Sequence, residues 1–274
     1  MLRKYIDKFL KMDRRIIFAL LTLMMFIPLI KPLGLPNKTV GVRTQQVYDF
    51  IENLKPGSFI LISLDYDPST RPELHPQAKT LIRQCFRNDV RVAVMTFLPG
   101  ATGLIEEIFA TIPQEYNKKE GVDYVVLPYQ PNPVAVMTQL GSNIYTMYDK
   151  DARDNPTKTM PVMKGITNYR DMDAVVCITG TALLDYWVQY AGDKYHVPML
   201  GGVTAVSQPS YGPYLQKGQL KGLIGGMKGA ADYEKLIGKL GKGTKGIDAL
   251  NLAHLLVLFL IITSNILLFF MKRK

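Results

Sequence analysis

Cysteine, histidine and tryptophan are scarce in this chain of 274 residues, which contains two, three and one of them, respectively. Neither cysteine belongs to a CxxC pair, and His75 and His196 stand apart from other metal-ligand residues, so we expect no metal. Cys85 falls on an expected helix and Cys177 on an expected strand. One disulfide is compatible with their number, but two small buried side chains fit these positions better.

Several binding motifs are also absent. No GxGxxG or GxxxxGK[ST] motif follows an expected strand, and no GxSxG motif occurs, so nucleotide binding and serine hydrolysis have no support. The net charge of +10 is concentrated at the chain ends, because residues 36–248 hold 23 of the 33 cations and 21 of the 23 anions. That region has no basic stripe of the kind that nucleic-acid binding requires. We expect no cofactor and no nucleic-acid partner.

A long apolar run does occur near the C-terminus. Leu252–Met271 is twenty residues long, has no formal charge and is followed by Lys272, Arg273 and Lys274. A helix of this length rises about 30 Å, the thickness of the hydrocarbon core of a bilayer. A buried core helix of this length would normally keep a polar face. We therefore expect a transmembrane helix within residues 249–271 and a basic tail at 272–274.

The N-terminus repeats the pattern in reverse order. Residues 1–15 carry six cations and two anions, which predicts a basic amphipathic segment on an anionic membrane face. Residues 16–35 are mostly apolar and predict a first transmembrane helix. A cleaved signal peptide shows the same order, but no small-residue cleavage site follows, which favours an uncleaved anchor.

Basic residues flank the outer ends of both expected spans. The positive-inside rule then predicts a two-pass protein of the cell (inner) membrane, with the lipid bilayer as a partner. Both termini would be cytoplasmic and residues 36–248 extracytoplasmic.

Between the two spans, helical and strand patterns alternate. Five short apolar runs are typical of buried parallel strands; they are Ser58–Leu64, Val90–Phe97, Val122–Tyr129, Ala174–Thr179 and Val197–Val203. Amphipathic helical patterns separate them, and the polar stretch Asp149–Thr159 is expected to be an excursion. The alternation predicts an α/β domain over residues 36–218, with a doubly wound, mostly parallel, five-stranded Rossmann-like sheet flanked by N- and C-terminal transmembrane helices.

Polar residues follow several of these strands. With the strand order 3-2-1-4-5, the ends of strands one and four flank the crevice in which such sheets bind ligands. Carboxylates beside hydroxyls and helix N-termini suit a small polar ligand or an anion. The expected ligand-binding residues are Asp65, Asp67, Ser69, Gly100, Thr179, Gly180 and Thr181.

A sharper hypothesis concerns catalysis. Asp65-Tyr66-Asp67 on one strand, with Thr96 ending the next, resembles the first two motifs of the haloacid-dehalogenase-like hydrolases. The resemblance implies that Asp65 is a nucleophile, Asp67 an acid/base and Mg²⁺ a cofactor. Pro68 departs from the usual turn, and no acidic pair follows a later strand. A magnesium-dependent, phosphatase-like hydrolase is therefore the alternative, and a non-catalytic domain is favoured.

Residues 219–248 are unusually rich in glycine. Their apolar residues have a helical period and predict a juxtamembrane helix and linker, although each interior glycine costs a helix up to about 1 kcal/mol relative to alanine. Glycines four residues apart let backbones approach closely. One interpretation is self-association into a homo-oligomer, and the other is tight packing on the chain's own sheet. The residues concerned are Gly222, Gly225, Gly226 and Gly229.

Several short motifs carry a resemblance to a known group of proteins. The motifs lie at residues 65–68, 73–76, 122–125, 213–220 and 229–234. They resemble an uncharacterised prokaryotic family of two-span membrane-anchored proteins with a Rossmann-like α/β domain. The resemblance implies a membrane protein of that fold and transfers no activity. We therefore expect a non-catalytic scaffold, ligand sensor or accessory subunit, with other membrane subunits as possible partners.

Overall fold

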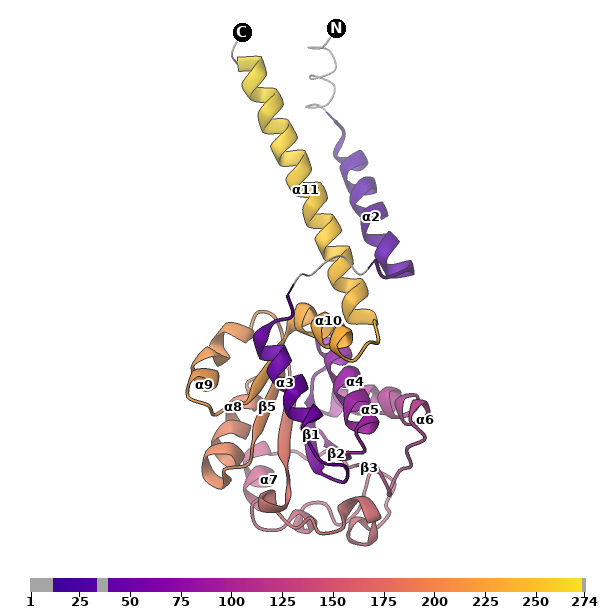
Figure 1. Ribbon diagram of the computed structural model, residues 1–274, viewed down its shortest axis with the longest axis vertical. Helices are drawn as coiled ribbons and strands as arrows, with labels where there is room; N and C mark the ends of the chain where they lie inside the picture. The colour runs from indigo at the N-terminus through magenta and orange to yellow at the C-terminus, as the bar shows by residue number, and fades with distance from the viewer. Residues whose placement is uncertain (1–11, 34–38, 273–274) are drawn as a thin grey trace.

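The computed structural model describes residues 12–33 and 39–272. Its centre is a six-stranded, wholly parallel sheet with the strand order β3-β2-β1-β4-β5-β6 (Figure 1). This is the order of a doubly wound Rossmann-like sheet. The strands are β1 (Phe59–Asp65), β2 (Arg91–Met95), β3 (Tyr124–Val126), β4 (Ala174–Thr179), β5 (Met199–Val203) and β6 (Gly222–Gly225).

The apolar composition of β1 follows from its central position. All seven of its residues are buried, because helices cover both faces of the sheet. Phe59 and Leu61 face one hydrophobic core, whereas Ile60 and Ile62 face the other. The sequence therefore correctly predicted a buried parallel strand here.

Two helical layers enclose the sheet. One face is covered by α3 (Val42–Glu52), α4 (Arg71–Arg87), α5 (Thr102–Phe109), α6 (Ile112–Glu115) and α10 (Gly226–Leu236). The other face is covered by α7 (Pro133–Leu140), α8 (Leu183–Trp187) and α9 (Gly212–Gln216). A π-helical turn, Val188–Asp193, continues α8. The 3₁₀ turns are Pro99–Ala101, Ile144–Thr146, Thr157–Thr159, Pro161–Met163, Tyr169–Asp171 and Gln208–Tyr211.

The sixth strand corrects the sequence-based prediction. Residues 222–225 were expected within a helix, but they form β6 and pair with β5, with Leu200 opposite Gly222. Leu223 faces one core and Ile224 the other, which is the alternation of a strand. A short apolar run fits both periods, so the pattern alone did not decide between them. The domain has six strands, and it extends beyond residue 218.

All four glycines of the predicted self-association helix are buried against their own chain. A Cβ on Gly222 would lie 2.7 Å from the backbone nitrogen of Val47, and one on Gly226 would lie 2.7 Å from the Cβ of Ala205. Gly226 also has a φ of +58°, which favours glycine. Packing on the chain's own sheet therefore explains these glycines. Self-association stays a prediction, and these buried positions offer it no surface.

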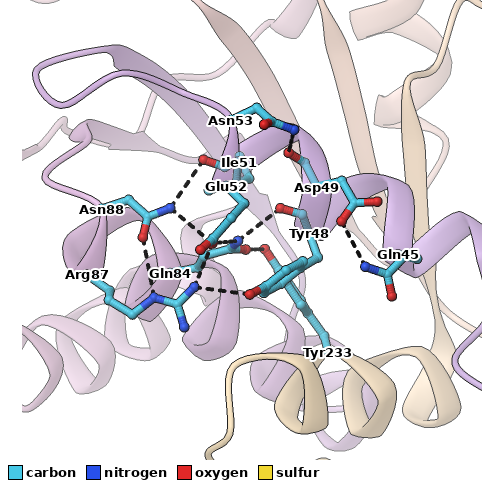
Figure 2. Close-up of polar contacts among 10 residues, drawn as sticks. All are labelled: Gln45, Tyr48, Asp49, Ile51, Glu52, Asn53, Gln84, Arg87, Asn88 and Tyr233. Atoms are coloured by element: carbon cyan, nitrogen blue, oxygen red, sulfur yellow. Dashed lines mark hydrogen bonds and ion pairs between the residues drawn. The ribbon is translucent and has the colours of Figure 1, made fainter.

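A polar network joins three helices of one layer (Figure 2). The buried Gln84 of α4 donates from Nε2 to the carbonyl of Tyr48 and to Glu52 Oε2, both at 2.9 Å, on α3. Its Oε1 accepts the hydroxyl of Tyr233 on α10. Arg87 completes the cluster with an ion pair to Glu52 at 2.6 Å. Because the buried amide is fully hydrogen-bonded, it stabilises one arrangement of α3, α4 and α10.

The end of α10 carries a carboxylate that caps the next helix. Glu234 is buried and accepts hydrogen bonds from the backbone N–H groups of Gly241, Gly243 and Thr244, at 2.7 to 2.9 Å. The hydroxyl of Thr244 adds a fourth bond at 2.6 Å. These N–H groups have no partner inside a helix, and a negative charge favours a helix N-terminus. Helix α11 (Lys242–Lys272) therefore begins inside the domain, before the predicted start at 249.

The N-terminal segment is held by two more buried carboxylates. Helix α2 (Arg14–Ile30) runs antiparallel beside α11, so the start of α2 lies on the same side as the later turns of α11, away from the sheet (Figure 1). After α2, the N–H of Leu33 donates to Asp248 of α11 at 2.9 Å. Before α3, the N–H of Gly41 donates to Asp232 of α10 at 3.0 Å. The segment between α2 and α3 is thus hydrogen-bonded to α11 at one end and to α10 at the other.

Within residues 12–33 and 39–272, one helix is long and apolar enough to cross a membrane. It is the stretch Lys242–Phe269 of α11, and none of its most apolar window is buried. Helix α2 has 17 residues and a length of about 25 Å, short of the bilayer core of about 30 Å. By length and composition, then, the predicted C-terminal span meets the criterion for a membrane-spanning helix, and the described part of the predicted N-terminal span does not. The predictions for residues 1–11, 34–38 and 273–274 lie outside the described residues.

Replacing Gly222 with alanine tests why this region is rich in glycine. We expect Gly222→Ala to lower the free energy of unfolding by about 1–3 kcal/mol, because the new Cβ overlaps the backbone of α3. Thermal unfolding of the detergent-solubilised full chain measures this. Gly103→Ala is the control, since no atom lies within 4 Å of its new Cβ. An unchanged stability with a loss of multimers on native mass measurement would contradict the packing interpretation.

Candidate functional site at the carboxyl edge of the sheet

The carboxyl edge of the sheet faces the two long helices. Arg71 and His75, in the first turns of the helix that follows β1, line a cavity with Leu29 of α2 and Lys245 of α11. Because all strands are parallel, their carboxyl ends lie at this same edge. The edge at which sheets of this topology bind ligands is therefore the one nearest to α2 and α11.

Asp65, the last residue of β1, is fully buried. Its Oδ1 accepts the backbone N–H of Phe97 at 2.7 Å, and its Oδ2 accepts the hydroxyl of Ser63 at 2.5 Å. Thr96 adds a weaker contact at 3.3 Å, and the thiol of Cys177 lies 3.9 Å away. Burial raises the pKa of Asp65 to about 6, against the opposing effect of these hydrogen bonds. The carboxyl group ties β1 to the end of β2.

Asp67 has a different role, two residues further on. It is exposed, and its Oδ1 accepts the backbone N–H and the hydroxyl of Ser69, at 2.9 and 2.6 Å. The N–H of Thr70 is a third donor, at 3.3 Å. The hydroxyl of Ser69 is the main reason that the pKa of Asp67 lies below its ordinary value. This is an Asx turn that leads into α4.

The crevice between β1 and β4 is closed by the chain itself. The hydroxyl of Thr179 donates to the carbonyl of Asp65 at 3.1 Å and lies 2.9 Å from the hydroxyl of Thr181. A Cβ on Gly180 would lie 3.0 Å from Thr70, so the loop after β1 packs directly on the end of β4. The structure thus brings the predicted residues together, but the chain's own side chains and loops fill the space between them. Gly100 is the remaining one, and it lies beside Asp67.

This arrangement does not fit a magnesium-dependent hydrolase. A nucleophilic carboxylate must reach the substrate, whereas Asp65 has no exposed surface and both its oxygens are hydrogen-bonded. Oδ1 of the exposed Asp67 is engaged by the backbone N–H groups of Ser69 and Thr70, as the acceptor of a turn. No group of three or more potential metal ligands occurs among the described residues. In this geometry Asp65 holds the end of β1 to the end of β2, and Asp67 stabilises the turn before α4.

The two cysteines are free, and both are buried. Cys85 lies in α4 and Cys177 in β4, so they occupy the helix and the strand that the sequence predicted. Burial raises the pKa of both thiols, that of Cys85 to about 12. Neither is suited to be a nucleophile at neutral pH.

A cavity of about 500 Å³ lies beyond the closed crevice, beside β2, β3 and α5. Only one of the predicted site residues, Thr96, lines it. Its charged residues include Glu106, Glu120 and Arg153, and Glu120 and Arg153 form an ion pair of 2.9 Å. Burial raises the pKa of Glu120. Sequence reasoning missed this cavity, because segments far apart along the chain meet there and no local motif marks them.

Comparison with known proteins adds no relative. No family model matches the chain, and no curated protein or solved structure matches it significantly. The resemblance to two-span membrane-anchored proteins therefore stays a prediction. What the chain does must be argued from its geometry.

Substituting Asp65 tests the buried carboxyl group. Its folded pKa of about 6 exceeds the ordinary 3.8, so the folded state binds the extra proton between these values. Its contribution to stability should therefore fall as pH rises from about 4 to about 6, by about 3 kcal/mol, and Asp65→Asn should remove this slope.

Thermal unfolding across pH 3.5–7 measures the difference between wild type and variant. Asp67→Asn is the control with the opposite sign, because a lowered pKa contributes stability that is lost as pH falls. Parallel curves for wild type and Asp65→Asn would show that Asp65 does not hold the proton.

Proposed function

We propose that this protein is a non-catalytic membrane protein, in which two helices anchor an α/β domain that acts as a ligand sensor, scaffold or accessory subunit. The observation that carries the proposal is α11. Its apolar side chains are exposed, as for Leu255, Phe259 and Ile262 at 59, 60 and 56 %, while its first turn is capped inside the domain. A water-soluble protein does not leave such a surface uncovered.

The second anchor in this proposal is α2. Its 17 residues lie at the lower limit for a spanning helix. Phe18, Leu23 and Phe26 are more than half exposed, so α2 also presents apolar side chains away from α11. In a two-pass arrangement both termini lie on one side of the cell membrane and the domain on the other, and the basic flanks favour the cytoplasmic side for the termini. The exposed faces of α2 and α11, and not the buried glycines, are the surfaces left for self-association or for other membrane subunits.

A sensor needs a place for its ligand, and the 500 Å³ cavity beside β3 is the candidate in the domain. Its lining combines the aromatic rings of Phe109 and Tyr129 with the carboxylates of Glu106 and Glu120. Glu106 is exposed, while Glu120 is paired with Arg153. This chemistry suits a small organic molecule with a positively charged group.

A charge placed in the middle of each helix tests the anchors. Ile262→Arg in α11 and Leu23→Arg in α2 put a cation at the expected bilayer centre, where insertion costs about 3 kcal/mol. We expect each to reduce the fraction of the chain that stays in membranes after an alkaline carbonate wash. Val206→Arg is the matched control, at a side chain of the domain that is 88 % exposed. Complete extraction of the wild-type chain by carbonate would refute membrane anchoring.

The non-catalytic assignment has its own test. Purified full-length chain with Mg²⁺ should release phosphate from p-nitrophenyl phosphate no faster than the buffer does, because Asp65 cannot reach a substrate. Phosphate release that requires Mg²⁺ and disappears in Asp65→Asn would restore the hydrolase hypothesis. Asp185→Asn is the matched control for a contaminating phosphatase. Asp185 lies away from Asp65, on the other face of the sheet, where it accepts hydrogen bonds from Tyr211 and Tyr214.

A further inference from the structure

We propose that the cavity between α2, α4, α10 and α11 binds the phosphate-bearing headgroup of an anionic phospholipid. The cavity measures about 480 Å³ and lies where both long helices meet the domain. This inference rests on the proposed membrane anchoring, and it adds a lipid-specific site to it. Each of the four helices contributes to the lining, namely Leu29, Arg71, His75, Met227, Lys242 and Lys245.

The charges around the cavity are mostly positive. Arg71 and Lys79 both pair with Glu107, Lys79 at 3.6 Å, so one carboxylate serves two cations. Among the described residues, no carboxylate lies within ion-pair distance of Lys242 or Lys245. Within the described part of the chain, the ammonium group of Lys245 has one long contact, of 3.4 Å, to the carbonyl of Ile30. The cavity therefore has unneutralised positive charge that a phosphate can neutralise.

Two further carboxylates lie near the first turns of α11, but among the described residues neither forms an ion pair with these lysines. Glu234 is used by the N–H groups of Gly243 and Thr244, and Asp248 accepts the N–H of Leu33. Both are buried, and neither lines the cavity. The positive charge of Lys242 and Lys245 is thus directed at the cavity or at solvent.

The hydrogen-bond donors also suit a phosphate. The guanidinium of Arg71 uses Nη2 for Glu107 and keeps further N–H groups, whose planar arrangement matches phosphate oxygens. His75 is 99 % buried, and its Nδ1 lies 3.0 Å from the hydroxyl of Tyr66. Its Nε2 lies 3.3 Å from Oε1 of Glu107, so the same carboxylate that pairs with Arg71 and Lys79 is also the neighbour of His75.

The rest of the lining distinguishes a lipid from a free phosphate. Leu29, Pro72, Pro76 and Met227 give the cavity apolar walls, which the glycerol and upper acyl carbons of a lipid can cover. Leu29 is itself 48 % exposed at the domain end of α2, where the headgroup region of a bilayer would lie. Basic residues at the end of a spanning helix reach this region. We therefore commit to a lipid as the occupant.

The test compares lipid binding by two variants of equal charge. Lys242→Ala/Lys245→Ala removes the two unpaired cations of the cavity. The control, Lys217→Ala/Lys221→Ala, removes two exposed lysines beside the separate cavity at the amino ends of β5 and β6. Full-length chains in detergent are titrated with phosphatidylglycerol or phosphatidylcholine, and bound lipid is counted by native mass spectrometry.

We expect wild type and control to prefer phosphatidylglycerol, and the Lys242/Lys245 variant to bind it about 30-fold more weakly. Equal binding by all three chains, or no preference for the anionic lipid, would overturn the proposal. A third titration uses glycerol 3-phosphate without lipid. If that soluble phosphate binds as tightly as the lipid and with the same loss in the variant, the occupant is a free phosphate and the lipid assignment is wrong.

The carbonate wash separates this inference from the proposed function. A chain that resists extraction but shows no lipid preference keeps its anchors and loses only the headgroup site. A chain that carbonate extracts loses both. The Lys242/Lys245 variant should resist extraction as wild type does, because its apolar helices are unchanged, and equal melting temperatures confirm that it is folded.

Discussion

The carboxylate of Glu234 joins the sheet to the long apolar helix, and the arrangement of the whole molecule depends on it. Four hydrogen bonds from the first turn of α11 converge on this one side chain. A free helix N-terminus would leave those donors to water and the helix free to swing. Here the helix keeps a single direction relative to α10. That direction sets which edge of the sheet lies next to α2, and with it the position of the basic cavity.

The carboxyl edge of this sheet is used differently from that of a typical nucleotide-binding domain. Asp65, Thr179 and Thr181 stand where a ligand would be expected, yet they hydrogen-bond to one another's strands and loops. Thr70 closes on Gly180. The polar side chains at the crevice thus stabilise the ends of β1, β2 and β4. Open space at this edge includes a cavity beside β3 and another beside the long helices.

Much of the fold could be predicted from the sequence. Buried parallel strands appear as continuous apolar runs, and the segment Val42–Arg87 alternates clearly between the helical and the strand period. The five buried strands were predicted, and the order assumed for them is the one observed. Strand β6 was not predicted, since its four residues include two glycines and match a helical pattern as well. Asp65 and Thr96 were both named as candidate catalytic residues, and they lie 3.3 Å apart. Their role was not predictable, because exposure and hydrogen-bond partners depend on the fold. No local motif pointed to Glu234 or Asp248. Asp248 accepts the N–H of the distant Leu33, and Glu234 accepts the N–H of Gly241 across a turn that only the folded chain forms.

The hydrogen bond from Leu33 to Asp248 joins positions 215 residues apart. During translation, α2 leaves the ribosome long before Asp248 has been made, so it must wait without this partner while the entire sheet is synthesised. A polypeptide that ends before Asp248 can contain β1 to β6 and still lack the hydrogen bond to Leu33. Helix α11, which is made after the whole sheet, therefore supplies the hydrogen bond that fixes the end of α2.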